Sequence, residues 1–147
     1  MEFPMEKGDG MKKLLMGSSM LAVLCASLPA ANAEGPAAAL EVRSIRLDAE
    51  GKDYLRLLGG PPETVTMRSG LVVLGPGKSV GRHNTKGYEE MVIVLEGRGE
   101  MRSFAGRPAV PLEAGMAAYC PPKTEHDVFN TGDTPLKYVY VVAAAGD

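Results

Sequence analysis

The sequence predicts an all-β protein, either a β-sandwich or a closed barrel, on the basis of two observations. Beyond residue 40, short stretches rich in β-branched and aromatic residues alternate with turns that contain Gly or Pro. No segment beyond residue 34 sustains a convincing helical period over twelve residues. Many short strands at near-regular spacing are typical of sandwiches and barrels, and we expect closure because unpaired sheet edges invite aggregation.

The predicted strands follow one another at short intervals. Turn signals separate them at residues 59–62, 75–77, 106–108, 121–122 and 130–133. The segment from Asp48 to Leu58 is expected to form at most a turn or two of helix. The strands are expected at residues 41–47, 63–74, 88–97, 99–104, 115–120, 125–130 and 136–143.

The first 33 residues have the organisation of an N-terminal extension and an export signal. A basic start at Lys12 and Lys13 precedes a mostly apolar stretch, residues 14–28, and the small residues at 31–33 suit a signal peptidase. We expect cleavage after Ala33, which directs a domain of residues 34–147 to the periplasm or the medium. Two alternatives stay open: translation from Met11, and an uncleaved anchor, although the apolar stretch is shorter than the roughly 20 residues that cross a bilayer.

Length, charge and cysteine content exclude several classes of protein. A chain of 147 residues is the length of one ordinary domain. Sixteen basic and eighteen acidic residues give a net charge of -2 without a Lys/Arg stripe, so nucleic acid is not an expected partner. If Cys25 leaves with the signal, only Cys120 remains and no internal disulfide can form.

The chain has only two histidines, His83 and His126, and both stand beside turns. Residues two apart on a strand face the same way, so His83 and Thr85 are expected on one face. A turn at 86–87 then lets the following strand bring a glutamate to the same point, and His126 could meet them across a small barrel. Because a buried charge without a partner is costly, a shared metal ion would explain such a cluster.

Two motifs resemble those of the cupin superfamily. The first has a glycine, five residues, a His-x-His pair, three or four residues, a glutamate, six residues and a glycine. The second has a glycine, five residues, a proline, one residue, a glycine, two residues, a histidine, three residues and an asparagine. Matching positions are Gly77, His83, Glu90 and Gly97 in the first and Gly115, Pro121, His126 and Asn130 in the second; Thr85 replaces a histidine and Lys123 a glycine.

The resemblance covers roughly residues 64–143 and implies a small single-domain cupin of the conserved-barrel type, a double-stranded β-helix or jelly roll. It also implies that His83, Glu90 and His126 bind a divalent transition metal. Thr85 stands at the possible fourth position, where a hydroxyl is a poor ligand and water or substrate could bind instead. Two imidazoles and one carboxylate favour Fe(II), and Mn, Zn, Ni or Cu could also bind.

Each of these residues also has a simpler interpretation. The two histidines could be packed and hydrogen-bonded in a barrel without a metal. Glu89 competes with Glu90, because adjacent strand residues face opposite ways, and the distance to Gly97 favours Glu90. Four further residues are candidates to line a pocket, although strand packing, a buried thiol and a solvated turn would explain them too: Tyr88, Tyr119, Cys120 and Lys123.

Several function classes remain open at this stage. One is a metal-dependent enzyme, dioxygenase-like or isomerase-like, that acts on a small oxygen-containing molecule. Another is a non-catalytic module that binds a small ligand, with a degenerate or absent metal site. A weaker third is a purely structural oligomerisation domain. Apolar residues occupy both faces of 91–95, so we expect another sheet or subunit to cover the outward face, and the resemblance also favours a homodimer.

Overall fold

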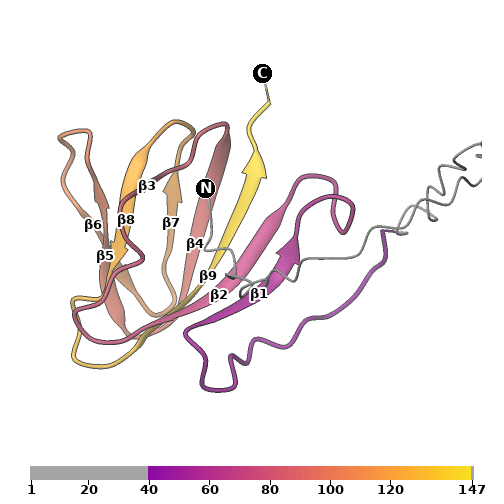
Figure 1. The fold of residues 1–147 in the computed structure, drawn as a ribbon. Helices are drawn as coiled ribbons and strands as arrows, with labels where there is room; N and C mark the ends of the chain where they lie inside the picture. The colour runs from indigo at the N-terminus through magenta and orange to yellow at the C-terminus, as the bar shows by residue number, and fades with distance from the viewer. Residues whose placement is uncertain (1–39, 147) are drawn as a thin grey trace, which may run out of the picture. The chain divides into compact units, whose positions relative to one another are not determined.

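Two antiparallel β-sheets make up the part of the chain that this computed structural model describes, residues 40–146 (Figure 1). The five-stranded sheet has the order β1-β2-β9-β4-β7, and the four-stranded sheet has the order β3-β8-β5-β6. Within these residues no helix occurs, and hence none that could cross a membrane. The strands are β1 (Tyr54–Gly59), β2 (Arg68–Leu74), β3 (His83–Asn84), β4 (Tyr88–Glu96), β5 (Arg98–Ser103), β6 (Val110–Glu113), β7 (Ala117–Cys120), β8 (Glu125–Phe129) and β9 (Leu136–Ala144).

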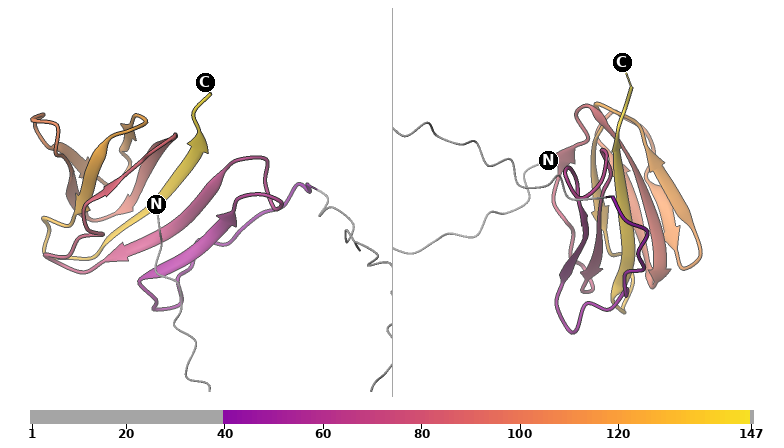
Figure 2. Two further views of the ribbon diagram at one scale, coloured as in Figure 1. Left: turned by 45° about the horizontal axis from the view of Figure 1, so that its top comes forward. Right: turned by 90° about the vertical axis from the view of Figure 1, so that its right-hand side faces the viewer.

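Strands β2 to β9 form a double-sheet jelly roll of eight strands, and β1 extends one sheet at its edge. The views in Figure 2 show the two sheets as separate walls. The sheet edges are β1 and β7 on one wall and β3 and β6 on the other, so the strand ladders do not close the structure completely. The all-β prediction is therefore confirmed, and the barrel is formed by two facing sheets.

The hydrophobic core lies between the two sheets because each strand turns alternate residues inward. On β4, Glu90, Val92 and Val94 are buried, whereas Met91 and Ile93 face outward and are 45% and 37% exposed. A smaller apolar cluster is formed by Ala49, Leu57, Leu71 and Val139, with Leu55, Val73, Leu95 and Val141 packed against it. The main core contains Val72, Leu74, Val92, Val94, Met101, Leu112, Ala118, Cys120, Val128, Leu136, Tyr138, Tyr140 and Val142.

Two predictions about the first part of the domain are wrong. Residues 41–47 form no strand and are exposed, because no described strand offers them a partner. Residues 54–59, where helical turns were expected, form β1 and pair with β2 in a register that places Tyr54 opposite Val72. Here pairing with β2 and burial of Leu57 override the local helical preference of a leucine-rich stretch.

Strand β6 was missed in the sequence because it contains Pro111. Proline cannot donate to a β-ladder, so it argues against a central strand, but β6 lies at the edge of its sheet, where proline is tolerated. Strand β3 was missed because it has only two residues. The other predicted strands appear, most of them with modest shifts at their ends, whereas the strand expected at 63–74 begins only at Arg68. The predicted signal peptide, residues 1–33, lies outside the described residues.

Two motif residues, Gly97 and Asn130, serve the backbone. Gly97 has a φ of +78°, and a Cβ there would lie 2.3 Å from the carbonyl oxygen of Pro135, so no other residue fits without rearrangement. The fully buried side chain of Asn130 donates from Nδ2 to the carbonyl oxygens of Leu74 and Thr134, at 2.8 and 2.9 Å. These contacts hold the turn between β8 and β9 against the end of β2.

Candidate metal centre

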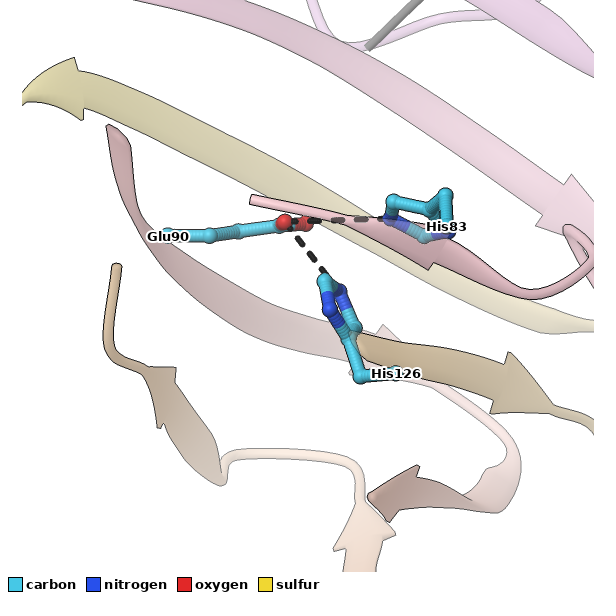
Figure 3. Close-up of side chains that lie close together, drawn as sticks. All are labelled: His83, Glu90 and His126. Carbon is cyan, nitrogen blue, oxygen red and sulfur yellow. Dashed lines mark ion pairs between the residues drawn. The ribbon is translucent and has the colours of Figure 1, made fainter. Parts of the chain in front are cut away.

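Three strands bring His83, Glu90 and His126 together inside the jelly roll (Figure 3). His83 on β3 is the direct partner of His126 on β8, and side chains of directly opposed residues lie on the same face of a sheet. Glu90 comes from β4 in the facing sheet and is buried. One ligand atom from each residue lies within 4.8 Å of the other two. Residues far apart in the chain thus form one compact cluster.

The cluster is tightly spaced and becomes more exposed toward His83. The Nε2 atom of His126 lies 3.2 Å from Oε2 of Glu90, and Nε2 of His83 lies 4.0 Å from the same oxygen. The two imidazole rings are tilted by 58° with their centroids 4.2 Å apart. Side-chain exposure is 1% for His126, 4% for Glu90 and 24% for His83. His83 is therefore the most exposed member of the cluster.

Two atoms at the centre of the cluster are buried without a hydrogen bond. They are Oε2 of Glu90 and Nε2 of His126, which lie close together but not in hydrogen-bonding geometry. Buried polar atoms of this kind are rare because leaving them unpaired costs free energy. A metal ion bound between them would satisfy both, and imidazole nitrogen and carboxylate oxygen are common ligands of divalent transition metals. The residues present therefore fit a metal.

The other ring nitrogen of each histidine faces an acceptor. Nδ1 of His83 lies 2.8 Å from the carbonyl oxygen of Gly81. Nδ1 of His126 lies 3.4 Å from both Sγ of Cys120 and the carbonyl oxygen of Thr124. Such contacts favour the tautomer with hydrogen on Nδ1, which leaves the Nε2 lone pair free for a metal. These orienting contacts were missed in the sequence because they depend on backbone carbonyls and on a thiol with no distinctive spacing.

The charge of the cluster also depends on His126. Burial lowers the pKa of this imidazole, but the hydrogen bond with Cys120 and the nearby Glu90 carboxylate outweigh burial and raise the pKa to about 10. A pKa raised in this way favours an ion pair between the imidazolium of His126 and the carboxylate of Glu90 when no metal is bound. Metal binding requires neutral imidazole and must release this proton.

Thr85 is buried beside the cluster, and its hydroxyl is engaged with the backbone. It donates to the carbonyl oxygen of Pro121 and accepts from the N–H of Thr124, both at 2.9 Å. These contacts tie the turn after β3 to the turn before β8. Thr85 stands where the first motif has a second histidine, and its two contacts give it a role in positioning these turns.

The remaining candidate residues are distributed around the cluster. Glu89 is exposed on the outward face of β4 and accepts a hydrogen bond from the hydroxyl of Tyr119 at 3.0 Å, so Glu90 alone of the two acids joins the histidines. Tyr119 and Cys120 line a cavity that also reaches His126. Tyr88 lines a separate small cavity, and Lys123 is exposed in a turn.

The fold and this cluster define a class of protein: a jelly roll that carries a possible metal site between its two sheets. Residues 70–142 match the family model described as a cupin domain. The chain therefore belongs to the cupin superfamily, and residues 40–146 contain one cupin domain.

Individual relatives agree with this assignment. The chain is 33% identical over 69 residues to the "Oxalate-binding protein" of Thermotoga maritima, a match that spans 47% of this chain and 55% of that protein. A Cupin 2 conserved barrel domain protein of Salinispora arenicola is 29% identical, with a TM-score of 0.55 over 73% of this chain and 91% of its own. A cupin protein of Bacteroides fragilis is 20% identical, with a TM-score of 0.58 over 74% of this chain and 86% of its own, and supports the fold alone.

Proposed function

We propose that this domain binds a divalent transition metal through His83, Glu90 and His126 and uses it to hold a small oxygen-containing molecule. The observation that carries this proposal is a pair of buried atoms without a hydrogen bond, Glu90 Oε2 and His126 Nε2, 3.2 Å apart. Two imidazoles and one carboxylate favour Fe(II), with Mn, Zn, Ni and Cu as alternatives. When bound, such a metal supplies a Lewis acid that can polarise an oxygen-bearing ligand.

The chain's own residues prepare the site for this task. Glu90 contributes the negative charge that balances a cation, and the acceptors at Gly81 and Thr124 orient the two imidazoles. The surrounding apolar core keeps water away from the buried side of the cluster, which strengthens electrostatic contacts there. A cavity that reaches His126 leaves room for a ligand beside the cluster.

Two functions use this arrangement differently. The first is an enzyme of dioxygenase-like or isomerase-like type. The second is a non-catalytic binding module, which is favoured by the similarity to a protein named for oxalate binding and by Thr85 at the fourth position. An enzyme loses turnover when the metal is removed, whereas a binding module without a working metal site keeps its ligand affinity in metal-free protein. We further propose that residues 1–33 direct export and that the domain forms homodimers.

The metal proposal is tested by two matched substitutions on one strand. Glu90→Gln should lower the affinity for Mn²⁺ or Zn²⁺ at least about tenfold because it removes the charged ligand. Glu89→Gln should leave it unchanged, because that carboxylate faces outward toward Tyr119. Calorimetric titration of each protein, with elemental analysis of the wild type, measures both effects.

Each alternative outcome has a distinct meaning. Loss of metal in Glu89→Gln but not in Glu90→Gln would show that the other carboxylate is the ligand. A wild-type protein that binds none of these metals, including Fe(II) under anaerobic conditions, would leave the histidines as packed residues of an empty barrel.

A further inference from the structure

A cavity of about 480 Å³ lies between the edge strands β6 and β7. Its inner wall includes His126 and Cys120, so it ends beside the metal centre. Its outer part is bounded by the segment that joins β5 to β6, residues 104–109, which includes Arg107. The cavity therefore connects the surface with the ring of a candidate metal ligand.

The walls of this cavity are mainly apolar, and their permanently charged side chain is an arginine. Met101 and Val110 contribute apolar surface, and Arg107 is the only lysine or arginine among the lining residues, which include no aspartate or glutamate. Arg107 makes no ion pair with any residue from 40 to 146, whereas Arg102, on the preceding strand, is paired with Glu100 at 2.5 Å. An unpaired guanidinium beside an apolar cavity is suited to an anion, because its N–H groups match the two oxygens of a carboxylate.

The size of the cavity indicates what kind of anion fits. Ligand cavities of roughly 300–1,000 Å³ hold organic molecules of appreciable size. Oxalate, the smallest dicarboxylate, would leave most of this space unfilled and would make no use of the apolar walls. A carboxylate attached to an apolar body matches both the charge and the walls.

We propose that the cavity between β6 and β7 binds an organic monocarboxylate, with its carboxylate held by Arg107 and its apolar body against Met101 and Val110. The inner end of this ligand points toward His126. This assignment names the ligand class of the site proposed above and rests on that function, since His126, one of the three candidate metal ligands, lines the cavity. Arg107 is then a residue that determines specificity.

Benzoate and benzamide provide a matched pair of probes, because they differ in charge and little in shape. Titrated into the metal-loaded protein, benzoate should bind at least about tenfold more tightly than benzamide, since charged hydrogen bonds are stronger than neutral ones. Arg107→Gln should weaken benzoate binding about tenfold or more and leave benzamide binding unchanged. Arg46→Gln is the control, because Arg46 is exposed, carries the same charge and does not line the cavity.

A second variant tests the location of binding. Ala109→Trp places a large side chain at the cavity wall and should abolish binding of both probes. Retention of benzoate binding in Ala109→Trp would place the ligand elsewhere and overturn the assignment. An equal loss in Arg107→Gln and Arg46→Gln, or no preference for benzoate in the wild type, would also overturn it.

Metal content is measured in every sample by elemental analysis, which separates the two proposals. Protein that holds a metal but shows no preference for benzoate contradicts the cavity assignment alone. Protein that holds no metal but shows the preference and its loss in Arg107→Gln contradicts the metal centre alone.

Discussion

Lys123 occupies the position at which the second cupin motif has a glycine, and its backbone adopts a φ of +57°. Its N–H donates to the carbonyl oxygen of Lys86 at 2.7 Å, and Lys86 also has a positive φ, +53°. Two lysines with a left-handed backbone conformation thus link the turn after β3 to the turn before β8. A left-handed backbone costs a residue with a Cβ about 1–2 kcal/mol relative to glycine's freedom there.

This strain predicts that Lys123→Gly stabilises the domain. We expect a gain of about 0.5–1 kcal/mol in the free energy of unfolding, because the relief of strain exceeds the extra entropy of glycine in the unfolded chain. Urea denaturation measures it. Lys52→Gly is the control, since Lys52 has no positive φ and should show no gain. Equal gains in both variants would contradict this explanation.

The residues of the cluster could be predicted from the sequence, but their surroundings could not. The resemblance to the cupin motifs selected His83, Glu90 and His126, and these residues lie together in the structure. The groups that face the Nδ1 atoms are two backbone carbonyls and a thiol, whose directions depend on how the turns pack. Arg107 stands in an ordinary Gly-Arg-Pro turn, and nothing in its sequence context distinguishes it from a solvated arginine.

At the scale of elements, the metal centre depends on the shortest strand. Strand β3 has two residues, and its register places His83 opposite His126. A slip of one residue would turn His83 to the other face of the sheet and separate it from Glu90. Contacts outside the ladder hold this register, namely those of Thr85 with Pro121 and Thr124. The threonine therefore supports the site by fixing a strand position.

Exposed apolar side chains on the outward face of β4 are the basis of a prediction about dimer formation. Met91 and Ile93 remain exposed there, whereas Leu95 is partly covered by the small apolar cluster. We expect wild-type protein to sediment as a dimer at micromolar concentration and Ile93→Lys to sediment as a monomer, because a charge would be buried at the interface. The substitution should preserve the fold, since this side chain points away from the core.

A matched variant controls for added charge. Val80 is exposed to a similar extent, 40%, and its N–H bonds to β8 in the other sheet, so Val80→Lys should remain dimeric. A monomeric wild-type protein, or equal dissociation in both variants, would contradict a dimer interface on the outward face of β4.

At the scale of the whole molecule, the all-β class could be predicted, but the sheet order could not. Local patterns of β-branched residues and turns indicate where strands occur. Strand β9 pairs with both β2 and β4, and no local pattern encodes such long-range partners. The resemblance to the cupin motifs indicated the fold class without this order, and it covered roughly residues 64–143, which is why β1 and the 41–47 segment were predicted less well.

At the same scale, we predict that the signal peptide is removed when the chain is exported. Protein recovered from the periplasm of a bacterial host should begin at Glu34 and lack Cys25, as shown by intact mass. Ala33→Arg should block cleavage, because the peptidase requires a small residue there, whereas Ala38→Arg should not. A recovered mass that includes residues 12–33 would contradict removal of the signal.

The incomplete closure of the two sheets has an evolutionary consequence. Strands β6 and β7 are edges of different sheets, so no common ladder fixes the distance between them. The selectivity of the entrance between them can change through substitutions or insertions in the 104–109 connection while every strand pairing is kept. The strands can thus preserve the fold while the 104–109 connection adapts to a new ligand.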